Sequence, residues 1–129
     1  MRVGTLGTFD VFHVGHLNIL ESARALGTEL VVGVSSDQLN MEKKGRLPVF
    51  SESHRMRLVS ALSCVDQVFL EESLDLKRKY VMDFGIELLI MGDDWQGKFD
   101  HLKDCCSVEY LPRTPAISTS AIIEVVKAR

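Results

Sequence analysis

The 129-residue sequence lacks the features that define several large classes of protein. Its three cysteines, Cys64 and the adjacent Cys105 and Cys106, form no C-x-x-C pair and no even disulfide framework. No apolar run approaches the roughly 20 residues that span a bilayer, and the N-terminus MRVGTLGTFD lacks the charged-then-apolar build of a signal peptide. These absences predict a cytoplasmic protein with reduced thiols and no membrane partner.

The chain also lacks an excess of positive charge, and it has no internal repeat. Lys and Arg number 15 against 18 Asp and Glu, which gives a net charge of −3. A general nucleic-acid-binding protein is usually clearly basic, so we expect no nucleic-acid partner. Hydrophobic residues make up 46% of the chain, enough for one compact domain over residues 1–129 without a disulfide or metal staple.

Short aliphatic runs alternate with amphipathic helical stretches along the chain. The runs that predict strands are Val3–Phe9, Leu30–Val34, Gln67–Leu70, Leu88–Met91 and Val108–Leu111. Helical periodicity occupies the segments between them and the C-terminal stretch, with Gly27 and Gly85 as helix ends. This alternation predicts an α/β fold with a single Rossmann-like, doubly wound parallel sheet of about five strands and helices on both faces.

The segment Ser36–Phe50 shows no apolar period and is too long for a simple connection, so we predict a functional or mobile loop there. Basic residues gather in and after it: residues 43–57 hold five Lys and Arg against one acid. A solvated surface is the usual meaning of such a run. Here it follows the second strand, where ligands of a doubly wound sheet bind, and it would supply countercharge for phosphates.

The first candidate site follows the first strand. Gly7-Thr8-Phe9-Asp10 leads to His13-Val14-Gly15-His16, which opens a helix. A helix N-terminus offers unpaired N–H groups and the positive end of the dipole, and the two imidazoles at i and i+3 face the same ligand. Neutral imidazoles would donate N–H bonds and protonated ones would neutralise phosphate charge. Zinc binding is disfavoured, because no third ligand has suitable local spacing.

The second candidate site follows the last strand, where Arg113-Thr114-Pro115-Ala116-Ile117-Ser118-Thr119-Ser120 opens the final helix. Its hydroxyls would cap the helix or bind anions, and Arg113 adds a permanently charged donor fork. A third segment, residues 91–100 with the adjacent Asp93 and Asp94, follows the fourth strand. It would bind a hydroxyl-rich acceptor or water around Mg²⁺, or form an Asp-rich turn.

The paired blocks GTFD and HVGH resemble the signature of the nucleotidyltransferase superfamily with the HxGH motif. The segment from Arg113 to Thr119 resembles the RTxGIST element of its cytidylyltransferase branch. Over essentially the whole chain the sequence is similar to the glycerol-3-phosphate cytidylyltransferases of teichoic-acid synthesis. That resemblance implies transfer of CMP from CTP to glycerol 3-phosphate, with pyrophosphate released, by a homodimer that uses Mg²⁺ held by the nucleotide phosphates without direct protein ligands.

The resemblance also implies roles for individual residues. Catalysis would rest on His13, His16, Arg113 and a cation of the basic loop, which the spacing leaves open among Lys43, Lys44 and Arg46. The nucleotide would be bound by Gly7, Thr8, Phe9, Asp10, Gly15, Arg46, Arg113, Thr114, Ile117, Ser118 and Thr119. The acceptor would be bound by Asp10, Arg55, Lys77, Asp94 and Trp95.

Four positions depart from the pattern of these enzymes. Pro115 offers no backbone N–H, and Ala116 stands where the family usually has glycine, which costs energy if the position needs a positive φ. Ser63 and Leu74 replace an arginine and a tryptophan. The alternatives are therefore a cytidylyl- or adenylyltransferase acting on another polyol or amino-alcohol phosphate, and a nucleotide-binding module without turnover.

Overall fold

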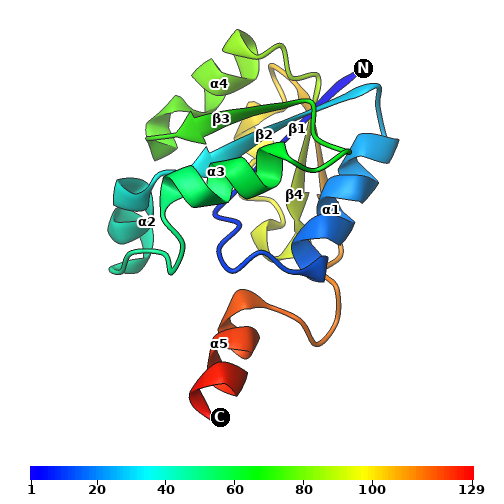
Figure 1. Cartoon of the computed structure of the whole chain (residues 1–129). Helices are drawn as coiled ribbons and strands as arrows, with labels where there is room; N and C mark the ends of the chain where they lie inside the picture. Colours follow the sequence, from blue (N-terminus) through cyan, green and yellow to red (C-terminus); the bar gives the residue numbers. More distant parts are fainter.

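The computed structural model describes residues 1–129 and contains one five-stranded sheet, with all strand pairs parallel. The strands are β1 (Arg2–Gly7), β2 (Glu29–Ser35), β3 (Gln67–Glu71), β4 (Leu88–Gly92) and β5 (Ser107–Leu111). The helices are α1 (Val14–Ala25), α2 (Asp37–Lys44), α3 (Glu52–Ser60), α4 (Lys77–Asp83) and α5 (Thr119–Lys127). Single 3₁₀ turns lie at Leu74–Leu76, Asp93–Trp95 and Asp100–Leu102. The predicted Rossmann-like architecture is confirmed (Figure 1).

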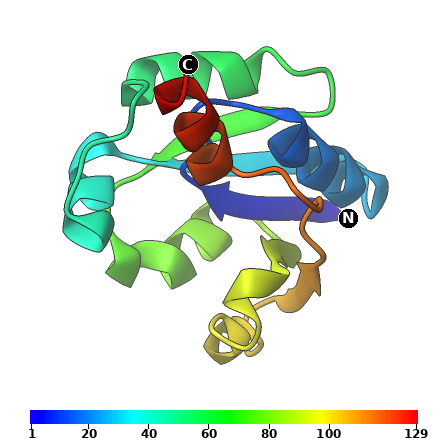
Figure 2. The same ribbon diagram turned by 90° about the horizontal axis from the view of Figure 1, so that it is seen from below.

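Each face of the sheet carries its own hydrophobic core. On one face, Leu20 and Ala23 of α1 and Val59 of α3 pack with buried strand residues such as Val32. On the other face, Val81 of α4 packs with Leu89 and with residues of the segment between β4 and β5. Figure 2 shows α1 and α3 on one side of the sheet and α4 on the other. β2 and β4 are buried on both faces, which explains why their sequences are largely aliphatic.

A functional or mobile loop was predicted over Ser36–Phe50; the prediction of a loop is wrong for the first half of this segment, which forms α2. The Ser36 hydroxyl caps this helix by accepting from the Leu39 N–H at 3.0 Å, and Gly45 ends it with a left-handed φ of 73°. The helix buries Leu39 and the polar Asn40. Because one of its two buried residues is polar, no apolar period shows in the sequence.

The strand order β3-β2-β1-β4-β5 determines where a ligand would bind. Successive strands run outward from β1 in one direction and then from β4 in the other, so the switch point lies between β1 and β4. The turn that carries GTFD and HVGH leaves β1 at this point. None of the helices is long and apolar enough to cross a bilayer.

Candidate active site

A cavity of about 1030 Å³ lies at the carboxyl ends of β1 to β4. The β1–α1 turn, the ends of β2 and β3, α2, the segment after β4 and the start of α5 all contribute to its lining. Of the residues that the sequence singled out for catalysis or binding, every one except Arg55 lines this cavity. The structure thus brings together five parts of the sequence: residues 7–16, 43–46, 77, 94–95 and 113–119.

The two histidines of the HVGH block form a stacked pair at the N-terminus of α1. Their ring centroids are 3.8 Å apart. His13 Nδ1 accepts from the Gly15 N–H at 3.0 Å, and His16 Nδ1 accepts from the His13 N–H at 3.2 Å, which together make a capping box. A nitrogen that accepts carries no proton, so each neutral ring has its proton on Nε2.

The surroundings of the pair favour the neutral form of both rings. Burial lowers the pKa of His16 to about 4, helped by the neighbouring His13 and opposed by Asp10. Burial also lowers the pKa of His13, helped by the positive charge of Arg113. Of the two forms that the sequence left open, these surroundings favour neutral imidazoles with the proton on Nε2.

Gly15 is required by the packing of this pair. A Cβ at position 15 would lie 2.8 Å from His13 Cε1 and 3.3 Å from Ile117 Cγ2. The sequence analysis gave Gly15 a role in nucleotide binding; in the structure its absent side chain makes room for the His13 ring and for Ile117. The turn before the pair is also strained, since Phe9 and Val11 have φ values of 54° and 47°.

Asp10 holds this strained turn against the chain that follows α2. One carboxylate oxygen accepts from the N–H groups of Val11 (3.0 Å) and Phe50 (2.9 Å), and the other accepts from Val49 (2.8 Å). Thr119 Oγ1 donates to the Asp10 carbonyl oxygen at 2.7 Å and attaches the start of α5 to the same turn. In this structure the Asp10 carboxylate binds backbone amides, whereas the sequence predicted contacts with nucleotide and acceptor.

Arg55 differs most from its sequence-based prediction as an acceptor ligand. Its side chain is fully buried and does not line the cavity. The guanidinium donates to the carbonyl oxygens of Phe50, Thr8 and Ser35 and pairs with Asp37 Oδ1 at 2.7 Å. These contacts join the ends of β1 and β2 to α2 and α3. Arg55 therefore holds together the elements around the cavity.

Three cations of the basic loop reach the cavity, and their environments differ. Lys43 is half-buried, its Nζ donates to Ser35 Oγ at 3.1 Å, and burial lowers its pKa. Lys44 and Arg46 are exposed and form no ion pair. Asn40, which is buried, donates to the Arg46 carbonyl oxygen at 3.1 Å and fixes the start of this exposed chain.

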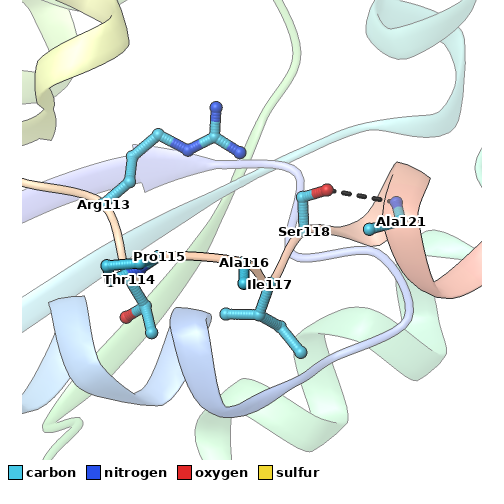
Figure 3. Close-up of a pocket in the computed structure, with 7 residues that line it drawn as sticks. All are labelled: Arg113, Thr114, Pro115, Ala116, Ile117, Ser118 and Ala121. Atoms are coloured by element: carbon cyan, nitrogen blue, oxygen red, sulfur yellow. Dashed lines mark hydrogen bonds between the residues drawn. The ribbon is translucent and has the colours of Figure 1, made fainter.

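The segment after β5 forms a smaller pocket of about 340 Å³ at the rim of the cavity, drawn in Figure 3. Ala116 has a φ of 62°, the conformation that favours glycine at this position. Thr114 Oγ1 accepts from Asn18 Nδ2 of α1 at 2.9 Å, and Ser118 Oγ caps α5 by accepting from the Ala121 N–H at 3.1 Å. In Figure 3 the Arg113 side chain points away from Thr114.

Three of the residues predicted to bind the acceptor, Lys77, Asp94 and Trp95, line the cavity from α4 and from the segment after β4. Lys77 Nζ donates to Glu71 Oε2 at 2.6 Å and lies 5.2 Å from the centre of the Phe99 ring. Asp94 and Trp95 lie in the 3₁₀ turn after β4, and Trp95 is 39% exposed. Leu74 also lines the cavity, whereas Ser63 does not.

The polar residues of the cavity that were not identified from the sequence include Ser35, Asn40 and Glu71. Ser35 and Glu71 are the last residues of β2 and β3. Their position at strand ends is the signal that would have found them, since ligands bind beyond the carboxyl ends of such strands. Asn40 gave no signal, because α2 itself was not predicted.

The donor set of the cavity does not suit a resident metal ion. No group of three or more His, Cys, Asp or Glu side chains is placed to hold one. The Asp10 carboxylate already accepts three N–H bonds, and Glu71 is paired with Lys77. Any divalent cation would therefore rely on ligands brought by the substrate.

Comparison with known proteins agrees with this geometry. The cytidylyltransferase-like family model matches residues 5–125. The chain is 44% identical to glycerol-3-phosphate cytidylyltransferase of Bacillus subtilis (97% of this chain, 96% of that protein) and 39% identical to the Staphylococcus aureus enzyme of that name (94% and 91%). A lipopolysaccharide core biosynthesis protein from Thermoplasma volcanium superposes with a TM-score of 0.70 at 30% identity, covering 88% of this chain and 96% of that one. With the motif residues gathered in one cavity, the match over nearly its full length means that the chain belongs to the cytidylyltransferase-like family.

Proposed function

We propose that this protein is an enzyme that transfers CMP from CTP to glycerol 3-phosphate and releases pyrophosphate. One observation carries the proposal: a chain 44% identical to a glycerol-3-phosphate cytidylyltransferase over 97% of its length places most residues of its HVGH and RTPAIST blocks in a single cavity. A phosphate oxygen of glycerol 3-phosphate attacks the α-phosphorus of CTP in line. As that P–O bond forms, the bond to the bridging oxygen breaks and pyrophosphate leaves with the electron pair.

This reaction needs charge stabilisation more than proton transfer. The attacking phosphate is already an anion, so no general base is required, and the cavity shows no arrangement for a covalent intermediate. Neutral His13 and His16 would donate Nε2–H to oxygens on which negative charge accumulates. Because their Nδ1 atoms are held by backbone amides, the rings are oriented before substrate binds.

Different cations around the cavity would bind different phosphate groups of the two substrates. Lys43, Lys44 and Arg46 approach from the end of α2, and we propose Lys43 as the catalytic cation because its ammonium is half-buried and directed by Ser35. Arg113 would bind nucleotide phosphate beside His13. Lys77 would bind the phosphate of glycerol 3-phosphate. The Asp94 carboxylate would accept hydrogen bonds from the glycerol hydroxyls.

The nucleotide would occupy the side of the cavity formed by residues 113–119. The left-handed φ of Ala116 preserves the backbone shape that glycine would adopt, so Ser118 and Thr119 remain at the helix start despite the substitution. Pro115 still offers no N–H, so any nucleotide contact near it must use neighbouring amides. Mg²⁺ would enter with the triphosphate and shield its charge, without direct protein ligands.

We further propose a cytoplasmic homodimer. Nucleoside triphosphates are made in the cytoplasm, and the three cysteines are unpaired. α5 has no buried residue and exposes Val125 (53%) and Val126 (65%), which suits contact with a second copy. In Figure 1, α5 stands apart from the helices that cover the sheet. Sedimentation equilibrium of the wild type and Val126→Lys tests the dimer: the variant is expected to be monomeric.

The reaction is tested by pyrophosphate release across pairs of nucleotide and acceptor. We expect release with CTP and glycerol 3-phosphate, and much less with ATP or with ribitol 5-phosphate, phosphocholine or phosphoethanolamine. His16→Ala should lower turnover about 10²–10³-fold, the usual cost of one oxyanion donor. His54→Ala, which removes an exposed histidine outside the cavity, is the matched control. No release with any pair would identify a binding module instead.

A further inference from the structure

A buried carboxylate joins two lysines that reach the cavity from different helices. Glu71, at the end of β3, is 1% exposed. Its Oε2 accepts from Lys77 Nζ of α4 at 2.6 Å. Its Oε1 accepts from Ser35 Oγ at 3.2 Å, and Ser35 Oγ in turn accepts from Lys43 Nζ of α2 at 3.1 Å. Ser35 lies opposite Glu71 in the register of β2 and β3, so the sheet itself fixes this chain of bonds.

The bonds have a defined direction. Both lysines donate, the carboxylate only accepts, and the one hydroxyl proton of Ser35 is used on Glu71. Each ammonium has three N–H groups and donates one of them within this hydrogen-bond network, so two N–H groups remain on each lysine. Lys43, Lys77, Ser35 and Glu71 all line the same cavity. A phosphate in the cavity would meet the lysines with spare donors, with the carboxylate buried behind them.

We propose that Glu71 is a positioning residue of the transfer reaction: it holds Lys77 directly and Lys43 through Ser35. Two cations from separate helices are thereby fixed on one wall of the cavity before substrate binds. This inference rests on the proposed function, in which Lys43 and Lys77 bind the reacting phosphates. Glu71 is the carboxylate that positions both lysines.

The charges around Lys43 give the Glu71 carboxylate an electrostatic role in addition to its hydrogen bonds. Burial lowers the pKa of Lys43, as do the positive charges of Lys77, Lys44 and Arg55, while Glu71 is the charge that raises it. Without Glu71, three neighbouring cations would face Lys43 with no anion to offset them. The ammonium would then lose its proton at a lower pH than in the native protein.

The decisive variant is Glu71→Gln, which keeps the shape and an accepting oxygen but removes the charge. Its matched control is Glu72→Gln, at the adjacent exposed glutamate outside the cavity. With CTP and glycerol 3-phosphate, we expect Glu71→Gln to lower kcat about 10-fold and to raise the KM for glycerol 3-phosphate, because a small misplacement of a binding group slows transfer. The alkaline limb of the pH profile of kcat should move to lower pH. Glu72→Gln should match the wild type in all three readouts.

Two further variants separate positioning from stability. Ser35→Ala breaks only the link to Lys43, so it should lower kcat and leave the KM for glycerol 3-phosphate nearly unchanged. Glu71→Asp restores the charge and should recover the alkaline limb. If Glu71→Gln folds and keeps the wild-type kcat, KM and pH profile, the inference is overturned, whatever its thermal stability. If Glu71→Gln does not fold, an unchanged kcat in Ser35→Ala overturns the link to Lys43. Absence of turnover in the wild type would refute the proposed function. The variants test only the positioning role of Glu71, so the two failures are distinguishable.

Discussion

His13 and His16 should act as neutral donors at physiological pH, and this can be tested without substrate. A pKa of about 4 leaves roughly one His16 side chain in a thousand protonated at pH 7. Both Nδ1 atoms accept backbone N–H bonds, so the protons must lie on Nε2. Long-range ¹H–¹⁵N spectra of the imidazoles should show the Nε2–H tautomer for both residues between pH 7 and 8, and for His16 also at pH 6. The exposed His54 and His101 give an internal comparison in the same spectra.

The same pKa shift predicts how stability depends on pH. The folded state lowers the pKa of His16 from 6.5 to about 4, so the unfolded chain binds this proton more readily. Its contribution to stability is therefore complete above pH 6.5 and is lost as the pH falls toward 4. The difference corresponds to at most about 3 kcal/mol, and solvent at the cavity mouth reduces this to about 1–2 kcal/mol.

Urea unfolding of the wild type and of His16→Gln at pH 7.5, 6 and 5 measures this term. Gln does not titrate, and its amide supplies an N–H near the position of Nε2. Between pH 7.5 and 5 the wild type should lose about 1–2 kcal/mol more stability than the variant. A wild-type His16 that titrates above pH 6, or that carries its proton on Nδ1, would refute the reasoning. So would a kcat/KM that falls tenfold per pH unit above pH 7 with the titration of an imidazolium.

Further substitutions test separate parts of the site. Ala116→Gly should relieve the left-handed φ at position 116 and stabilise the protein by about 1 kcal/mol in urea unfolding; a loss of stability would contradict the strain. Arg55→Lys should cost about 3 kcal/mol of unfolding free energy, because one ammonium cannot replace four buried bonds, and near-native stability would argue against a supporting role. Asp10→Asn should weaken the hold on Val49 and Phe50, so limited proteolysis in this segment should become faster than in the wild type.

The sequence was sufficient to predict the sheet because the inner strands β2 and β4 are largely aliphatic runs, and the less buried β5 still holds Val108, Tyr110 and Leu111. The turns at the starts of α1 and α5 were also predictable, since His and Ser at helix starts cap the free backbone N–H groups. α2 was missed because only one of its two buried residues, Leu39, is apolar. The other, Asn40, donates a hydrogen bond through its side-chain amide, so the helix shows no apolar period. Secondary structure stabilised by caps at both ends, as by Ser36 and Gly45, is weakly encoded in hydrophobic pattern.

Arg55 shows why residue type and position could not decide a role. A basic residue at the start of a helix beside a phosphate site has two physical uses: it can bind the ligand, or it can tie the surrounding loops together. The choice depends on whether carbonyl oxygens converge on it, and those come from Thr8, Ser35 and Phe50. Convergence of distant backbone atoms is a property of the fold and leaves no mark in the local sequence.

The charge distribution around the cavity also differs from the one suggested by the sequence. Residues 43–57 are strongly basic as a segment, but Arg55 points inward and Arg57 lies outside the cavity. The cavity instead draws six basic side chains from several elements (Lys43, Lys44, Arg46, Lys77, Arg113 and Lys127) against four acidic ones, Asp10, Glu71, Asp94 and Glu124. Of these four, Asp10 is occupied by backbone amides and Glu71 by Lys77 and Ser35. A chain with a net charge of −3 thus presents a net positive cavity, and salt should weaken CTP binding by screening it. A KM for CTP that is independent of ionic strength between about 50 and 500 mM would contradict this account.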